Sequence, residues 1–213
     1  MRLTIDLTLQ PPLPTARGLT GTQSAPIERG KKSYAPGMDF VQLRRDRGEV
    51  LVIGLGNPLL GDDGVGWHIA QQVERELVGA SAPVEVDYLA VGGLALMERL
   101  AGCRRAIIAD AIVTGQTPPG TLYRLALDDL PAAFAGHLHS AHDASLAVAL
   151  KAGAALGIPL PEQVYIFGVE AASVCDFAET LSPPVAACVP QAARAVLEVL
   201  RQFELEDSGS DFS

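Results

Sequence analysis

The chain has 213 residues, of which 48% are hydrophobic and 5% are aromatic, and its formal net charge is −9. This length suits one well-packed domain, and an aliphatic core with few aromatic residues is typical of α/β proteins. A negative field repels nucleic acid and anionic membranes, so we expect neither as a partner, whereas metal cations or a basic peptide suit it better.

The cysteine content and the apolar pattern lead us to expect a cytoplasmic protein. Cys103, Cys175 and Cys188 are odd in number and form no C-x-x-C pair, which argues against a disulfide framework. The sequence shows no apolar stretch that reaches the length of a membrane span, and Met1–Pro12 lacks the pattern of a signal peptide.

Three segments of the chain differ in composition. Residues 1–48 are rich in proline, glycine and basic residues, and predict an N-terminal extension with little fixed structure. Within this extension only Leu3–Leu9 alternates as a strand would. Residues 49–203 predict the folded domain, and residues 204–213 form an acidic, serine-rich tail that we expect to fray.

Strand and helix patterns alternate along the folded domain. In chain order they predict a strand at Val50–Gly54, a helix at Asp63–Val78, a strand at Val84–Ala90, a short helix at Leu94–Leu100, strands at Arg105–Ile112 and Thr121–Leu125, an alanine-rich helix at about Asp143–Leu156, a strand at Val164–Val169 and a closing helix that begins near Pro183. This alternation predicts a three-layer α/β fold, with a mainly parallel twisted sheet and helices on both faces.

The stretch Val50–Gly66, with the sequence VLVIGLGNPLLGDDGVG, joins the first strand to the first helix through a glycine-rich turn. Its G-x-G start resembles a dinucleotide-binding fingerprint, but Leu59 occupies the third glycine position of G-x-G-x-x-G. Two acids near the helix N-terminus would also repel a pyrophosphate. Nucleotide binding is therefore a weak alternative.

Asp62 and Asp63 follow this turn at the carboxyl end of the first strand, where open α/β sheets bind their ligands. One acid at a helix start can cap the unpaired main-chain N–H groups. We assign the cap to Asp62 and expect Asp63 to face the crevice, although either residue could serve either role.

Asp110 lies near the carboxyl end of the third strand, after the apolar run Ala106–Ala109. If the first and third strands are neighbours, as in a sheet ordered 2-1-3, Asp63 and Asp110 meet across the crevice. Two carboxylates that close require either a proton or a cation between them. The alternative is that Asp110 is only a turn residue, although a lone acid among apolar neighbours is costly.

Three histidines lie in one loop, and we expect His137 and His139 to be solvated there. His142 differs because it lies at the start of the alanine-rich helix, where a fixed backbone would hold its imidazole in one orientation. Two carboxylates and one imidazole suit a divalent ion such as nickel, zinc or iron. The sequence holds neither an H-E-x-x-H motif nor a G-x-S-x-G nucleophile elbow, so these routes to hydrolysis are set aside.

The chain from about Val50 to Arg201 resembles the hydrogenase maturation proteases. Four separate pieces match in order and spacing: Gly54–Gly66, Ile107–Ala111, Pro119–Thr121, and Ser140-Ala141-His142 at the start of a helix. By this resemblance Asp63, Asp110 and His142 stand at the metal-contacting and catalytic positions of the family, and the fold is of the phosphorylase/hydrolase-like kind. The extension at residues 1–48 has no counterpart in the usual family pattern.

The resemblance implies a cytoplasmic endopeptidase that removes a C-terminal extension from the large-subunit precursor of a nickel–iron hydrogenase. Nickel would be held partly by that precursor and would act as a checkpoint, with no other cofactor. We expect a monomer. Two alternatives stay open: a nickel-binding module that cleaves nothing, and the less favoured nucleotide-binding protein.

Overall fold

The computed structural model describes residues 49–79, 84–90, 93–126 and 146–210. The predicted N-terminal extension, the candidate strand Leu3–Leu9 and the histidine loop lie outside the described residues. The described residues belong to the predicted folded domain and to the helix that closes it.

Five strands of the described chain form one sheet, in the order β2-β1-β3-β5-β4. They are β1 (Val50–Leu55), β2 (Val84–Leu89), β3 (Arg105–Ile112), β4 (Leu122–Ala126) and β5 (Gln163–Glu170). Only β4 is antiparallel, because it pairs with β5 in the opposite direction. The predicted strands and the predicted 2-1-3 order are confirmed.

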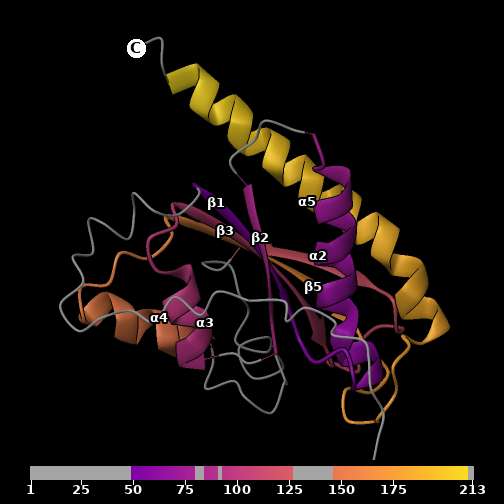
Figure 1. Ribbon diagram of the computed structural model, residues 1–213. Helices are drawn as coiled ribbons and strands as arrows, with labels where there is room; N and C mark the ends of the chain where they lie inside the picture. Colours follow the sequence, from indigo (N-terminus) through magenta and orange to yellow (C-terminus); the bar gives the residue numbers. More distant parts are fainter. Residues whose placement is uncertain (1–48, 80–83, 91–92, 127–145, 211–213) are drawn as a thin grey trace, which may run out of the picture. The chain divides into compact units, whose positions relative to one another are not determined.

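Helices cover both faces of this sheet (Figure 1). They are α2 (Val65–Glu76), α3 (Gly93–Leu100), α4 (Leu146–Ala155) and α5 (Pro183–Ser210). Helices α2 and α5 pack together on one face, and α3 and α4 pack together on the other. The predicted three-layer α/β fold is therefore confirmed.

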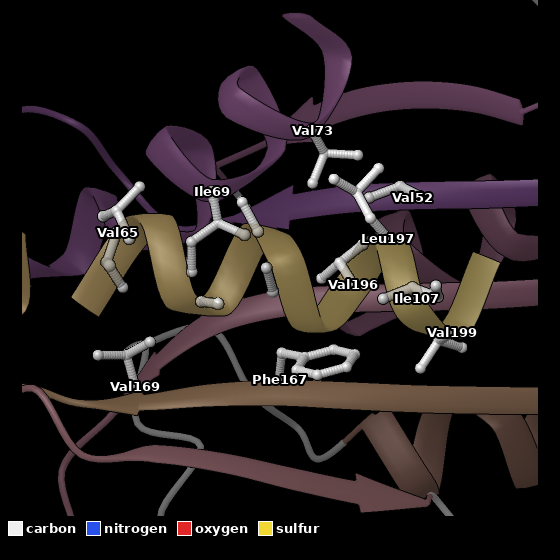
Figure 2. Packing of buried hydrophobic residues seen from close by; sticks show 14 of the residues in the cluster. Val52, Val65, Ile69, Val73, Ile107, Phe167, Val169, Val196, Leu197 and Val199 are labelled. Carbon is white, nitrogen blue, oxygen red and sulfur yellow. The ribbon is translucent and has the colours of Figure 1, made fainter. Parts of the chain in front are cut away.

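The central strands are buried on both faces, which explains their continuous apolar sequences. Val52, Ile107 and Phe167 point toward α2 and α5, where they meet Ile69 and Val196 (Figure 2). The alternate residues of the same strands belong to the second apolar cluster, beneath α3 and α4; they include Leu51, Ile53, Ile108 and Ile166. This two-sided packing fixes the register that positions the acids.

Helix α5 is longer than the sequence indicated. We expected the chain to fray from Glu204, but the helix continues to Ser210. The reason is a long-range contact, since Arg105 in β3 donates to the Phe203 carbonyl at 3.0 Å and to both carboxylate oxygens of Asp207. Among the described helices, none combines the length and apolar character that a membrane crossing requires.

Candidate active site

Four buried acids gather where β1, β3 and β5 end: Asp62, Asp63, Asp110 and Glu170 are each exposed by no more than 5%. Burying a carboxylate is costly unless hydrogen bonds or opposite charge compensate for the lost water. The hydrogen bonds of these acids therefore show which of them build the local structure.

A tight turn follows β1 and prepares the position of Asp63. The Asn57 carbonyl accepts a hydrogen bond from the Leu60 N–H at 3.0 Å, and Pro58 occupies the second turn position, where its fixed φ is favourable. The Asn57 side chain also accepts from the Leu59 N–H at 3.0 Å, as asparagine commonly does in turns. The turn is thus defined by its own sequence.

Asp63 lies in a short 3-10 helix, η1 (Gly61–Gly64), that links this turn to α2. Its Oδ2 accepts from the Asn57 N–H at 2.6 Å. Its carbonyl oxygen would lie 1.8 Å from a Cβ at Gly56, whose φ is +119°. Glycine is therefore required at position 56 on both steric and conformational grounds.

Asp63 and Asp110 are brought to the same end of the sheet by close packing at Gly66. A Cβ at Gly66 would lie 2.2 Å from the Ala109 carbonyl oxygen and 2.3 Å from that of Leu55. The first turn of α2 therefore lies directly on the ends of β1 and β3. Asp110 follows Ala109, which pairs with Gly54 of β1, and its Oδ1 accepts from the Ala111 N–H at 2.8 Å.

Asp62 has a different role from the one that its position suggested. No side-chain cap is formed at the start of η1 or α2. Instead, the Asp62 carboxylate accepts from the N–H and the hydroxyl of Ser182, at 2.7 and 2.9 Å, and from the Ala172 N–H at 3.3 Å. The predicted helix cap was wrong, and Asp62 joins the β1 turn to the loop before α5.

Glu170 is a buried acid that the sequence analysis did not single out. At the end of β5, its Oε1 accepts from the N–H groups of Thr114 and Gly115, both at 2.8 Å. Its Oε2 accepts from the Thr114 hydroxyl at 2.7 Å. Glu170 thus shapes the loop that follows β3, and an acid that ends an apolar strand was its only sequence signal.

Comparison with known proteins identifies the family. A family model described as "Hydrogenase maturation protease" matches residues 91–199. The chain is 33% identical to the "Hydrogenase 2 maturation protease" of Escherichia coli K12 over 159 residues, which cover 74% of this chain and 93% of that protein. The chain belongs to the hydrogenase maturation protease family. It is a peptidase.

Further relatives agree with this assignment. A hydrogenase expression/formation protein, HupD, of Thiocapsa roseopersicina is 30% identical, over 73% of this chain and 69% of that protein. The solved structure of the hydrogenase maturating endopeptidase HybD from E. coli matches with a TM-score of 0.62 and 31% identity, over 72% of this chain and 93% of that one.

The geometry of this maturation protease also bears on the nucleotide alternative. In a dinucleotide fingerprint the glycine turn leaves room for a pyrophosphate to approach the backbone. Here the carbonyl of Asp63 occupies the space over Gly56. The glycines of this turn therefore allow close packing within the protein.

Asp63 and Asp110 provide oxygen donors that suit a divalent ion. Because both carboxylates are buried, a cation bound beside them would be favourable, whereas an additional negative charge there would be unfavourable. In the part of the chain that the structure describes, no group of three His, Cys, Asp or Glu side chains could hold a metal. His142, the predicted third member, lies outside that part, so its place beside the two acids stays a prediction.

His68 is the one histidine within the described ranges, and it lies on α2. It is half-buried, and burial together with the nearby positive charge of Arg75 lowers its pKa. His68 does not join Asp63 and Asp110 in a metal-binding group of described residues.

Proposed function

We propose that the protein is an endopeptidase that removes the C-terminal extension of a nickel–iron hydrogenase large-subunit precursor after nickel insertion. Membership of the maturation protease family supports the peptidase activity. The observation that carries the site assignment is the packing of Gly66, which brings Asp63 and Asp110 to one end of the sheet. Action in the cytoplasm as a monomer is part of the same proposal.

The nickel in this proposal belongs to the substrate. Asp63, Asp110 and His142 would complete the ligand set of a nickel ion that the precursor already holds in part. Buried carboxylates gain from an approaching cation, whereas a precursor without metal offers no such gain. This difference provides a physical basis for a checkpoint, because metal-loaded precursor would bind more tightly than empty precursor.

Hydrolysis itself adds water across the peptide bond, so that the C–N bond breaks and the new carboxylate and amine separate. When bound, a divalent ion would polarise the carbonyl or lower the pKa of a water molecule. A carboxylate of the Asp63–Asp110 pair would be suited to accept the proton of the attacking water. The Asn57 N–H, which donates to Asp63, would hold that carboxylate in one orientation.

The proposal is tested by incubating the full chain with nickel-loaded and nickel-free large-subunit precursor and by following the C-terminus of the precursor by mass. We expect shortening only of the loaded precursor. Shortening of both forms would reject the checkpoint, whereas unchanged mass with tight binding would favour a nickel-binding module that cleaves nothing. If the precursor were neither shortened nor bound, this class of substrate would be rejected.

A further inference from the structure

Two surface segments meet beside the acids. Leu60 of the β1 turn and Ala178 of the loop after β5 form an isolated parallel bridge. The Gly61 N–H donates to the Ala178 carbonyl at 2.7 Å, and the Ala178 N–H donates to the Leu59 carbonyl at 3.1 Å. These two bonds hold the turn and the loop in a fixed register.

Leu59 and Phe177, which we call the apolar pair, immediately precede the bridged residues. Because Leu60 and Ala178 are paired in parallel, the residues that precede them lie next to each other along the two segments. Leu59 is 48% exposed and Phe177 is 76% exposed. Single exposed apolar side chains are ordinary, but two from distant segments beside one bridge suggest an interaction surface.

The backbone under the apolar pair is held on both sides. Asn57 fixes the turn that carries Leu59, and Asp62 binds Ser182 and Ala172 at the two ends of the loop that carries Phe177. A surface held in this way loses little conformational entropy when a partner binds. The apolar pair is therefore arranged in advance for contact.

In the two chain segments that carry the apolar pair, the acidic residues are not accompanied by lysine or arginine. Asp176 and Glu179 flank Phe177 in the loop, and both are exposed. Neither Val50–Glu74 nor Ala152–Ala193 contains a lysine or an arginine. A partner segment that complements this surface carries a large apolar side chain with a basic residue beside it, whereas a second copy of this surface would be repelled.

The position of Leu59 relative to Asp63 indicates which molecule brings that segment. The two residues are four apart in one turn, a separation that spans at most about 14 Å of chain. A peptide whose bond lies at Asp63 and Asp110 therefore passes close to the apolar pair. We propose that Leu59 and Phe177 form a docking surface for an apolar and basic segment of the precursor, an inference that rests on the proposed endopeptidase function.

The test compares the double variant L59S/F177S with the matched control L156S/L205S. Leu156 and Leu205 are exposed by 71% and 73%, so all four substitutions remove an apolar side chain from the surface. We expect the KM for nickel-loaded precursor to rise on the order of tenfold in L59S/F177S, since contact would bury only part of each side chain. The kcat of the double variant and both constants of the control should stay within about twofold of wild type.

The flanking charge is tested separately with D176N/E179Q. This variant should raise the KM at low salt, and the difference from wild type should vanish at high salt, because exposed charges are screened.

An unchanged KM in L59S/F177S, with full activity, would overturn the docking surface. An equal rise of the KM in the control L156S/L205S would also overturn the docking surface.

A binding measurement separates failure of this inference from failure of the proposed function. The association and dissociation rates of nickel-loaded precursor with otherwise wild-type protein, with and without L59S/F177S, give a Kd that does not depend on cleavage. Binding that weakens about tenfold while wild type cleaves nothing would reject the endopeptidase function and keep the docking surface. Absence of both binding and cleavage would reject both.

Two further measurements test whether another molecule or segment occupies the apolar pair. Sedimentation that reveals a wild-type dimer, lost in L59S/F177S, would assign the apolar pair to self-association and overturn the inference. Residues 1–48 are rich in lysine and arginine. If their removal lowered the wild-type KM and abolished the effect of L59S/F177S, the occupant would be that segment and not the precursor.

Discussion

The main-chain N–H of Asn57 donates a hydrogen bond of 2.6 Å to Oδ2 of Asp63. This bond closes the turn after β1 onto the acid that follows it. Gly56 lies on the other side of the same turn, against the carbonyl oxygen of Asp63. The position of the candidate catalytic acid is therefore set within one short stretch of sequence, apart from its packing on the end of β3.

Replacement of Asp63 by asparagine tests its chemical role with little change in structure. The asparagine side chain keeps an oxygen that accepts from the Asn57 N–H, but it loses the negative charge. We expect processing of nickel-loaded precursor to fall by about 100-fold or more, because both metal contact and proton transfer need the carboxylate. The C-terminal mass of the precursor gives the rate, and the melting temperature should stay close to that of wild type.

Asp110→Asn and His142→Ala extend this test to the other predicted members of the site. Asparagine at position 110 can still accept from the Ala111 N–H, so that hydrogen bond is kept in the variant. Glu206→Gln is the control, since Glu206 is an exposed acid on α5, outside both the site and the docking surface. Near wild-type activity in Asp63→Asn, Asp110→Asn or His142→Ala would remove that residue from the site.

Gly56→Ala and Gly115→Ala form a second matched pair. Both glycines have positive φ, +119° and +66°, but a Cβ at Gly115 meets nothing within 4 Å whereas one at Gly56 meets the Asp63 carbonyl. Gly115→Ala should cost about 1–2 kcal/mol of unfolding free energy, the cost of a left-handed conformation alone. Gly56→Ala should cost more than about 3 kcal/mol, because overpacking is added to that cost.

Urea unfolding measures both variants. Gly56→Ala should also lose processing activity beyond what its stability explains, since the clash displaces Asp63. Equal unfolding free energies in the two variants would mean that the turn relaxes around the new side chain. The close-packing role of Gly56 would then be rejected.

The sequence predicted those parts of the fold that depend on local pattern. The apolar runs at β1 and β3 identified two buried strands, because side chains packed on both faces leave no polar position. The acids Asp63 and Asp110 were found because each follows such a run. That these two acids are catalytic stays a prediction, and so does the role of His142.

The errors concern contacts between residues that are far apart in the chain. A carboxylate next to a helix start normally caps that helix, and nothing near Asp62 indicates that its partners are Ser182 and Ala172. The end of α5 was likewise misjudged, since its acidic and serine-rich composition predicts fraying. Its contact with Arg105 depends on the packing of α5 across the sheet.

Asp62→Ala tests the bond between the β1 turn and the loop before α5. The substitution removes three hydrogen bonds and leaves the N–H groups of Ser182 and Ala172 without this acceptor. We expect a loss of about 1–3 kcal/mol in unfolding free energy, the usual cost of an unsatisfied buried polar group. Glu179→Ala, an exposed acid in the same loop, should change stability by less than about 0.5 kcal/mol.

Stability should depend on pH through Asp207. The hydrogen bond from Arg105 holds the pKa of this carboxyl below its ordinary value of 3.8. A carboxyl with a lowered pKa in the folded state contributes stability that is complete above its unfolded pKa and is lost as the pH falls through the folded pKa. Asp207→Asn should therefore destabilise the protein near neutral pH and have little effect in strong acid.

Asp207 is 36% exposed, so solvent screening limits its contribution to about 1 kcal/mol, even though Arg105 is only 4% exposed. Urea unfolding of wild type and Asp207→Asn at about pH 7 and about pH 3 measures the difference. The neighbouring Glu206→Gln, which removes an exposed charge, is the control and should show no such dependence. A difference between wild type and Asp207→Asn that stayed constant from neutral to acidic pH would mean that the Arg105–Asp207 contact does not stabilise the end of α5 through charge.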